Sequence, residues 1–276
     1  MSRTRRCRMD RLARWAMGGA LGILGIAFAG LLLSVVMRGL PHLRPSMLLA
    51  DGQGGGIAHA LVGSLCLGAG ASVLALLLAL PAAVALQRAY APPRIAEAAA
   101  LVLDLLWGTP SIVYGAFAFL LMVWMGVRTS LLAGILTLAL VMVPVMTRAM
   151  TEAFRSLPPE LWEQATALGA TRGEITLKVA LRQALPGLVT AFLLAFGRGI
   201  GDAASILFTA GYTDRLPGSL MDPVASLPLE VFYQLATPDP TVQSRAHAAA
   251  LLLLILVLGV TLISRALARR ASRHRL

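Results

Sequence analysis

The stretch "SLPPELWEQATALGATRGEITLKVALRQALPG" (residues 156–187) lies between two long apolar runs and carries the strongest local folding signals in the chain. The two adjacent prolines near its start suit the first turn of a helix, where a missing amide donor costs nothing. Gly169 is a natural helix end because glycine adopts the left-handed conformation without strain. Thr171 and Glu174 then match a capping box, which predicts a second helix start. The stretch is therefore predicted to form two short helices joined by a sharp bend.

The first short helix of this pair has apolar residues at helical spacing. Leu161, Ala165 and Leu168 fall on one side of it, close to the bend at Gly169. An amphipathic hairpin lying on a membrane surface would show this pattern, and so would a docking surface for a second protein. The local pattern by itself leaves both interpretations open.

The composition around this stretch is that of a polytopic membrane protein. The chain has 276 residues, of which 58% are hydrophobic and 13% charged, and its mean hydropathy is +0.78. Soluble domains have nearer one quarter charged residues. The formal net charge of +11 does not indicate a nucleic-acid partner, because the cations sit in the tails and short loops rather than in a folded basic domain.

Six apolar stretches are long enough to cross a bilayer as helices, which takes about 20 residues each. The sequence therefore predicts an all-α fold with six transmembrane helices and the helix pair described above. The predicted spans are residues 16–37, 60–86, 98–125, 131–146, 187–211 and 246–264.

The distribution of arginine predicts the orientation. Arginines concentrate in the N-terminal tail, in the loop after the second span, in the segment that holds the bent helix pair and in the C-terminal tail. The other three connections hold Arg38, Arg44, Arg128, Arg215 and Arg245. Because cytoplasmic loops carry the excess of Lys and Arg, both termini are expected in the cytoplasm.

This orientation divides the chain into four parts. Residues 1–15 are expected to be a basic cytoplasmic tail, and residues 16–56 the first transmembrane helix with an external loop. Residues 57–264 are expected to form a five-helix transmembrane core, followed by a second basic cytoplasmic tail at residues 265–276.

An arginine and an aspartate interrupt the fifth apolar stretch. Arg198 falls near the middle of the predicted helix, and Asp202 lies one turn later on the same face, where the two are expected to pair. A charge at mid-membrane costs at least ~2.5–3.5 kcal/mol, so such residues usually face a bundle interior or a water-filled path. The pair is either structural or a contact for an oxyanion, whose oxygens match arginine's planar fork. Asp104 is a second charge in an apolar stretch and is expected to neutralise Arg198 in one conformation.

The remaining reactive residues form no recognisable site. Cys7 and Cys66 are too few and too differently placed for a disulfide framework, and the four histidines lack metal-ligand spacing. The single lysine, Lys178, is not part of a Gly-x-x-x-x-Gly-Lys-Ser/Thr phosphate-binding loop. We therefore expect no catalytic residue, no metal, no cofactor and no nucleotide site on this chain.

Several motifs together resemble a known family. Glu163, Gln164, Ala165 and Gly169 resemble the Glu-Ala-Ala-x-x-x-Gly coupling loop of binding-protein-dependent ABC importer permeases. The stretches "GGGIAHALVGSL" (54–65), "GTPSIVYGAFAF" (108–119), "LPGLVTAFLLAFGRGIGDAASILFTAG" (185–211) and "SLPLEVFYQLATPDP" (226–240) look like the phosphate branch of that family.

This resemblance implies an ATP-driven importer with several components. The bent helix pair, through Glu163, Ala165, Leu168 and Gly169, would dock on a dimer of cytoplasmic ATP-binding subunits, where hydrolysis occurs. A homologous permease subunit would complete the path, and an extracytoplasmic phosphate-binding protein would deliver the anion. Related phosphate permeases have Glu where this chain has Asp202. The alternatives are the same machine for another oxyanion, such as molybdate or sulfate, or a secondary transporter acting alone.

Overall fold

The predicted all-α class is confirmed by a computed structural model, which describes residues 3–87 and 89–272. Over these residues the chain forms helices and loops and contains no strand. The elements are α1 (Arg3–Gly39), η1 (Leu40–His42), η2 (Pro45–Leu48), α2 (Ala58–Ala85), α3 (Pro93–Gly108), α4 (Ser111–Met125), α5 (Leu131–Arg155), α6 (Glu160–Ala167), α7 (Arg172–Glu174), the π-helical turn η3 (Ile175–Ala180), α8 (Leu181–Ile200), α9 (Leu227–Leu235) and α10 (Pro240–Ser272).

Helices α2, α5 and α8 pack together as the centre of the bundle. The face that α2 turns to this core carries alanine at every fourth position, so the neighbouring backbones approach closely, as is common between membrane helices. Methionines of α5 fill the space opposite, since their flexible thioethers adapt to an irregular gap. The fully buried core residues of these two helices include Ala71, Ala75, Ala79, Ala83, Met142 and Met146.

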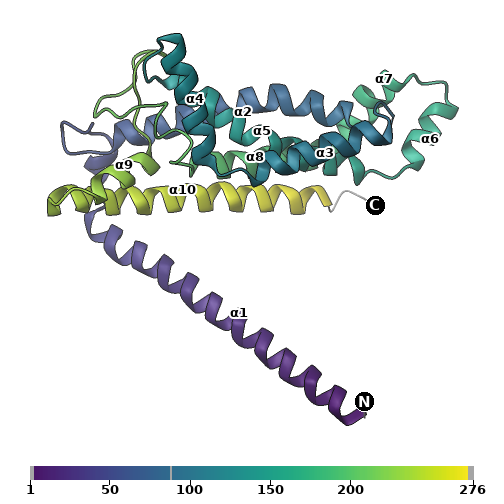
Figure 1. Cartoon of the computed structure of the whole chain (residues 1–276), viewed down its shortest axis with the longest axis horizontal. Helices are drawn as coiled ribbons and strands as arrows, with labels where there is room; N and C mark the ends of the chain where they lie inside the picture. Colours follow the sequence, from purple (N-terminus) through teal and green to yellow (C-terminus); the bar gives the residue numbers. More distant parts are fainter. Residues whose placement is uncertain (1–2, 88, 273–276) are drawn as a thin grey trace.

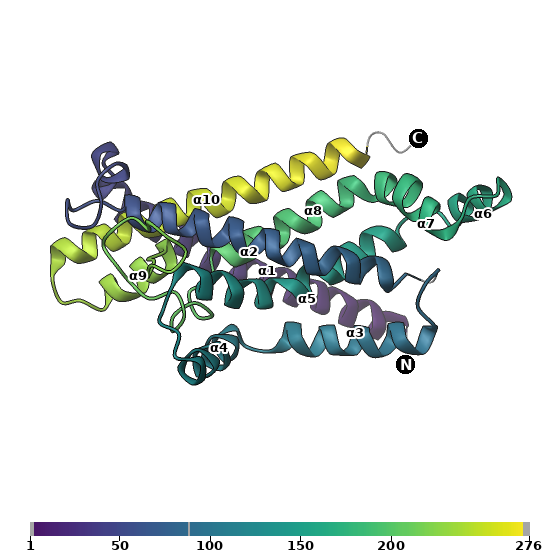
Figure 2. The same ribbon diagram turned by 90° about the horizontal axis from the view of Figure 1, so that it is seen from above.

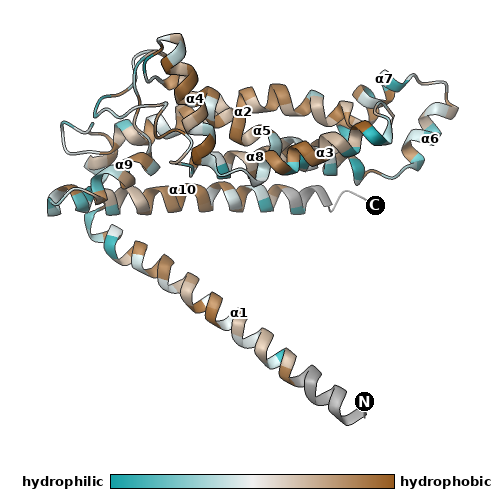
Figure 3. Cartoon of the chain, in the orientation of Figure 1, coloured by the Kyte–Doolittle hydropathy of each residue, from teal (hydrophilic) through white to brown (hydrophobic). Residues whose placement is uncertain are grey.

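Five helical stretches are individually long and apolar enough to cross a membrane. They are residues 12–42, 58–85, 131–155, 172–200 and 240–267. Four of the predicted spans agree with these stretches, although the helices that start at Leu131 and Pro240 extend further than the apolar runs alone indicated. Hydropathy mapped on the ribbon shows apolar residues along α1, α2 and α10 and polar residues on α6 (Figure 3).

The span predicted at residues 98–125 is not one straight helix. It is divided into α3 and α4, whose axes differ by 92°. Pro110 cannot donate a backbone hydrogen bond, and it forces the residue before it out of the α-helical region. Thr109 is accordingly extended, with φ −71° and ψ 129°. The hydroxyl of Tyr114 donates to the Leu106 carbonyl at 2.8 Å across the break, so the bend has a fixed geometry.

The span predicted at residues 187–211 is displaced along the chain. The helical stretch covers residues 172–200, and residues 201–211 form turns and loop. Gly201 follows the last helical residue, and Asp202 accepts a hydrogen bond from the backbone of Ser205 at 3.0 Å. Such side-chain bonds favour turns over helix. The second half of the predicted bent pair is thus the beginning of the transmembrane helix itself.

The bundle has two distinct ends. One carries α6, and we call it the α6 end; the other carries α9 and the two long loops, and we call it the α9 end. Both views place the beginning of α1 and the end of α10 toward the α6 end (Figures 1 and 2). Helix α1 diverges from the bundle and stays in contact with α10 at its own C-terminal end.

Candidate functional site

The bend at Gly169 is a well-formed helix terminus at the α6 end. Gly169 has φ +82°, the left-handed conformation that glycine adopts without penalty. Its N–H donates to the Thr166 carbonyl at 2.9 Å, and the Ala170 N–H donates to the Ala165 carbonyl at 3.1 Å. This pair of bonds is the Schellman motif. The predicted helix end at Gly169 is confirmed.

A new helix begins at Arg172, three residues after Gly169, with Thr171 as its N-cap. Thr171 accepts a hydrogen bond from the Glu174 N–H, and the Glu174 carboxylate accepts one from the Thr171 N–H at 3.1 Å. The predicted capping box is therefore present. Two independent terminal motifs, separated by one residue, fix the direction in which the chain turns.

The surface of the bend is divided between packed and exposed side chains. Leu161 and Trp162 of α6 pack against the core of the bundle, whereas Glu163 is exposed. Leu168 immediately precedes the bend and exposes 88% of its surface. The bend therefore presents one charged and one large apolar side chain to its surroundings.

Arg198 lies on the exposed surface of α8, two residues before the helix ends at Ile200. Its guanidinium is close enough to the hydroxyl of Tyr114 for electrostatic interaction. The expected position near mid-helix and the expected pairing with Asp202 are both wrong: the helix ends first, and within the described part of the chain no ion pair joins the two residues.

Asp104 pairs with a different arginine from the one expected. The Arg148 Nε donates to one carboxylate oxygen at 2.8 Å, and the Arg148 Nη2 contacts the other. This two-pronged contact joins α3 to α5 and is partly exposed, with side-chain exposures of 52% for Asp104 and 27% for Arg148. The expected neutralisation of Arg198 by Asp104 is therefore absent from this conformation.

The segment that follows Arg198 lies against α4. A methyl group at Gly115 would come within 2.6 Å of the Ser205 carbonyl oxygen, so only glycine permits this approach of α4 to the segment. Arg198, Tyr114 and the turn at Asp202 are thereby brought together next to the bend between α3 and α4.

The α9 end holds a buried polar cluster that was not predicted from the sequence. His59 and Glu230 are both fully buried, and the imidazole Nε2 lies 3.3 Å from the Glu230 carboxylate. The Tyr212 hydroxyl donates to the same carboxylate at 2.7 Å, and the Gln234 amide donates to its other oxygen. Burial and the Glu230 carboxylate raise the pKa of Tyr212, which therefore remains a hydrogen-bond donor. The cluster ties α9 to the beginning of α2.

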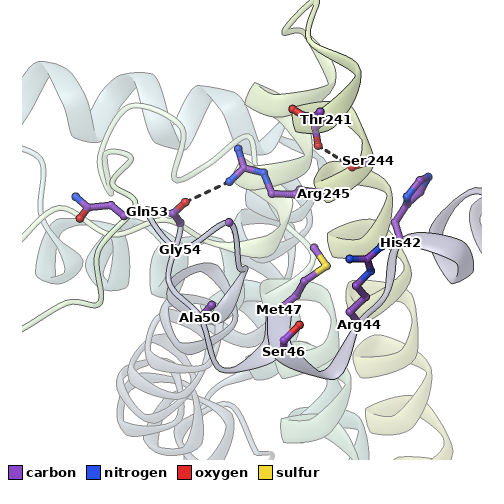
Figure 4. Close-up of a pocket in the computed structure, with 12 residues that line it drawn as sticks. His42, Arg44, Ser46, Met47, Ala50, Gln53, Gly54, Thr241, Ser244 and Arg245 are labelled. Atoms are coloured by element: carbon purple, nitrogen blue, oxygen red, sulfur yellow. Dashed lines mark hydrogen bonds between the residues drawn. The ribbon is translucent and has the colours of Figure 1, made fainter.

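A separate cavity of about 660 Å³ opens at the same end, between the loop after α1 and the beginning of α10 (Figure 4). Arg44 lines it from the loop after α1 and Arg245 from α10, together with His42 and Ser244. The Arg245 guanidinium donates to the Gly52 carbonyl at 3.2 Å, which holds the loop against α10. The cavity is thus cationic and lies apart from Arg198 in sequence and in fold.

No group of three or more His, Cys, Asp or Glu side chains is placed to hold a metal ion within residues 3–87 and 89–272. The features that stand out are therefore the bend at the α6 end, the arginine at the end of α8 and the ion pair between α3 and α5. They belong to a bundle whose long apolar helices are those of a polytopic membrane protein.

Comparison with known proteins identifies the family. The family model for binding-protein-dependent transport system inner membrane components matches residues 71–273, and the chain belongs to this family. The phosphate transport system permease protein PstA 1 of Mycobacterium tuberculosis is 34% identical over 230 residues, covering 83% of this chain and 74% of that protein. The corresponding probable permease of Methanocaldococcus jannaschii is 33% identical over 251 residues, covering 88% of each.

The fold is also that of solved ABC transporter structures. An inward-facing structure of the MetNI methionine ABC transporter aligns with 83% of this chain and 99% of its own, with a TM-score of 0.63 and 22% sequence identity. At this identity the likeness concerns the fold alone. It agrees with the arrangement of the bundle described above.

Proposed function

We propose that this chain is a permease subunit of an ATP-driven phosphate importer. Membership of the permease family supports the transport role, and the names of the relatives from Mycobacterium tuberculosis and Methanocaldococcus jannaschii support phosphate as the substrate. The observation that carries the proposal is the rigid bend at Gly169 with the exposed side chain of Leu168 beside it. A transporter that works alone has no need of such a surface.

The bend is proposed to dock on cytoplasmic ATP-binding subunits, which work as a dimer. Glu163 and Leu168 are exposed for this contact, while Ala165 and Gly169 supply the hydrogen bonds that shape the turn. ATP binding and hydrolysis take place on these partner subunits. Movement of the bend is transmitted directly to α8, because the capping box starts the helical stretch that continues into it.

The α6 end is accordingly proposed to face the cytoplasm. The beginning of α1 and the end of α10 point the same way, which agrees with the arginine distribution and puts both basic tails, residues 1–15 and 265–276, on the cytoplasmic side of a bacterial inner membrane. Residues 16–56 then hold the first transmembrane helix and an external loop, and residues 57–264 the core. The match of the family model to residues 71–273 supports this core.

Arg198 is proposed to lie on the path of the anion, and Asp202 to shape the turn beside it. The arginine is exposed on this chain at the junction of α8, α4 and the turn, where a homologous permease subunit would complete the path. A guanidinium offers several donors to a tetrahedral oxyanion. The two permeases would rock between outward and inward states, and an extracytoplasmic phosphate-binding protein would deliver the anion to the α9 end.

Phosphate uptake by the complete assembly tests this function. Cells that express the chain with its ATPase, second permease and binding protein should take up phosphate, and excess sulfate or molybdate should not compete. Arg198→Gln should abolish uptake without loss of assembly, because charged hydrogen bonds to an anion are about twice as strong as neutral ones. Arg198→Lys should keep partial activity. Asp202→Asn should be milder still, because the amide oxygen can still accept from Ser205.

Three outcomes would contradict the proposal. Competition by sulfate or molybdate would assign the same machine to another oxyanion. Uptake that continues without the ATPase would indicate a secondary transporter. Normal uptake by the Arg198→Gln variant would remove this residue from the path while leaving the subunit assignment intact.

A further inference from the structure

The loop between α2 and α3 is bonded reciprocally to the helix start that follows the bend. The Arg172 guanidinium donates to the Ala89 carbonyl at 3.0 Å. In return, the Tyr90 hydroxyl lies 3.0 Å from the Arg172 carbonyl and 2.7 Å from the Thr176 hydroxyl. These contacts join residues more than 80 positions apart in the chain, so they are a property of the folded protein rather than of local sequence.

The Tyr90 hydroxyl contacts the helix where its winding changes. Arg172–Glu174 is α-helical, whereas Ile175–Ala180 is a π-helix, and the Leu181 N–H donates to the Thr176 carbonyl five residues back. The Arg172 carbonyl also accepts from the Thr176 hydroxyl at 2.9 Å. Two hydroxyl groups therefore converge at the boundary between the two windings. Short π-helical turns inside α-helices occur frequently at functional sites.

The loop that carries Tyr90 is short, and hydrogen bonds fix it to the end of α2. The Tyr90 and Ala91 N–H groups donate to the Gln87 carbonyl at 2.9 and 3.0 Å, and the Gln87 amide donates to the Ala83 carbonyl at 2.7 Å, closing α2. Helix α3 begins at Pro93. A displacement of the Tyr90 ring is therefore transmitted to α3, since little chain lies between them to absorb it.

Helix α3 in turn is bonded to the centre of the bundle. Its Asp104 makes the two-pronged contact to Arg148 of α5, and its other end is the fixed bend that leads into α4. Tyr114, whose hydroxyl bonds across the bend between α3 and α4, is within electrostatic range of Arg198. The α6 bend is thus connected toward the proposed anion path by the hydrogen bonds of Tyr90, the chain of α3 and the contact between Asp104 and Arg148.

We propose that Tyr90 is a positioning residue: its hydroxyl couples the α6 bend to α3 as well as to α8, so that both helices move together when the ATPase moves the bend. This inference rests on the proposed docking of ATP-binding subunits at the bend. Without the hydroxyl, the hydrogen bond from Arg172 to the Ala89 carbonyl remains, but the coupling of the bend to α3 is weakened and ATP hydrolysis drives fewer transport events.

Tyr90→Phe tests this because it keeps the ring and removes the hydroxyl. In the complete assembly reconstituted in liposomes with the binding protein and phosphate, both ATP hydrolysis and phosphate uptake should be measured on the same sample. We expect normal assembly and ATPase activity, with phosphate taken up per ATP reduced about threefold to tenfold, as for the loss of one ordinary hydrogen bond. Tyr233→Phe, at a half-exposed tyrosine of α9, is the matched control and should leave the ratio unchanged.

Thr176→Val provides a second test if the Tyr90 variant does not accumulate. Thr176 is buried, and valine has nearly its shape without the hydroxyl, so this variant also weakens the junction and should lower the same ratio. An unchanged uptake-to-ATP ratio in these variants, whether or not protein abundance falls, would show that Tyr90 is a static brace and overturn the inference. Failure of the wild-type assembly to couple phosphate uptake to ATP would instead overturn the proposed function.

Discussion

Substitution of Gly169 by alanine should change the shape of the bend without changing the stability of the bundle. Gly169 has φ +82°, and a methyl group placed on it would meet no atom within 4 Å. The alanine therefore causes no steric clash with its surroundings, and the whole penalty is that of the left-handed backbone, roughly 1–2 kcal/mol for a residue with a Cβ. That penalty corresponds to about a 5- to 30-fold change in an equilibrium constant.

This penalty should appear in docking rather than in folding. The bend lies at the extremity of the molecule, so the packed core of α2, α5 and α8 is not disturbed. Gly169→Ala should leave membrane abundance and melting temperature close to those of the wild type and weaken the affinity for the purified ATP-binding subunit by up to about 30-fold. The affinity of the Gly169→Asn variant should lie between those of the wild type and of Gly169→Ala, because asparagine tolerates the left-handed region better than alanine.

Gly173 provides the matched control four residues away. A methyl group placed on it would also meet open space, but Gly173 lies in α7 and has no left-handed φ. Alanine there should be neutral or slightly favourable, since glycine in a helix costs roughly 0.5–1 kcal/mol relative to alanine. Binding of the ATP-binding subunit to each variant in detergent gives the comparison. Wild-type affinity for Gly169→Ala, or an equal loss for Gly173→Ala, would refute the docking argument.

Three further changes test other parts of the structure. Arg148→Gln leaves the Asp104 carboxylate without its cation in an apolar helix, which membranes disfavour, so membrane abundance should fall severalfold and should recover when Asp104→Asn is added; no recovery would contradict the pairing. Glu230→Leu removes the buried carboxylate nearest to His59 and should destabilise the purified protein by roughly 1–3 kcal/mol, with His59→Leu in the same chain restoring part of this loss in a thermal unfolding assay. Cysteines at positions 46 and 219 should react with an impermeant reagent from outside, whereas one at 272 should be protected, and the reverse pattern would invert the proposed orientation.

The features that could be predicted from the sequence are those with local causes. The helix end at Gly169 and the capping box at Thr171 depend on residues within a few positions of one another, and both are present as predicted. Four of the spans likewise follow from continuous apolar composition. In each of these places the chemistry of the stretch itself favours one backbone conformation.

Pairing partners could not be predicted in the same way. Asp104 and Arg148 are 44 residues apart, and His59 and Glu230 are 171 apart. Arg198 was expected to be the partner of Asp104 because it interrupts an apolar stretch. Arg148, in contrast, follows the predicted fourth span at its cytoplasmic end. Which arginine pairs with Asp104 depends on the 92° bend at Pro110 and on how α3 packs against α5. Hydropathy predicts neither of these.

Residues 201–211 show why apolar composition overestimates helix. Ser205, Ile206, Thr209 and Ala210 are almost completely buried, so the segment is apolar because protein surrounds it, although it is not helical. Irregular backbone is tolerated at membrane depth where protein or a water-filled cavity covers it. A hydropathy window responds equally to lipid and to protein interior, and it therefore extended the predicted helix well past Arg198. The arginine consequently stands where regular helix gives way to a turn, next to another broken span, rather than on the side of a continuous helix. Two interruptions of regular structure with an exposed cation close to them are the physical reason for the proposal that the anion passes there.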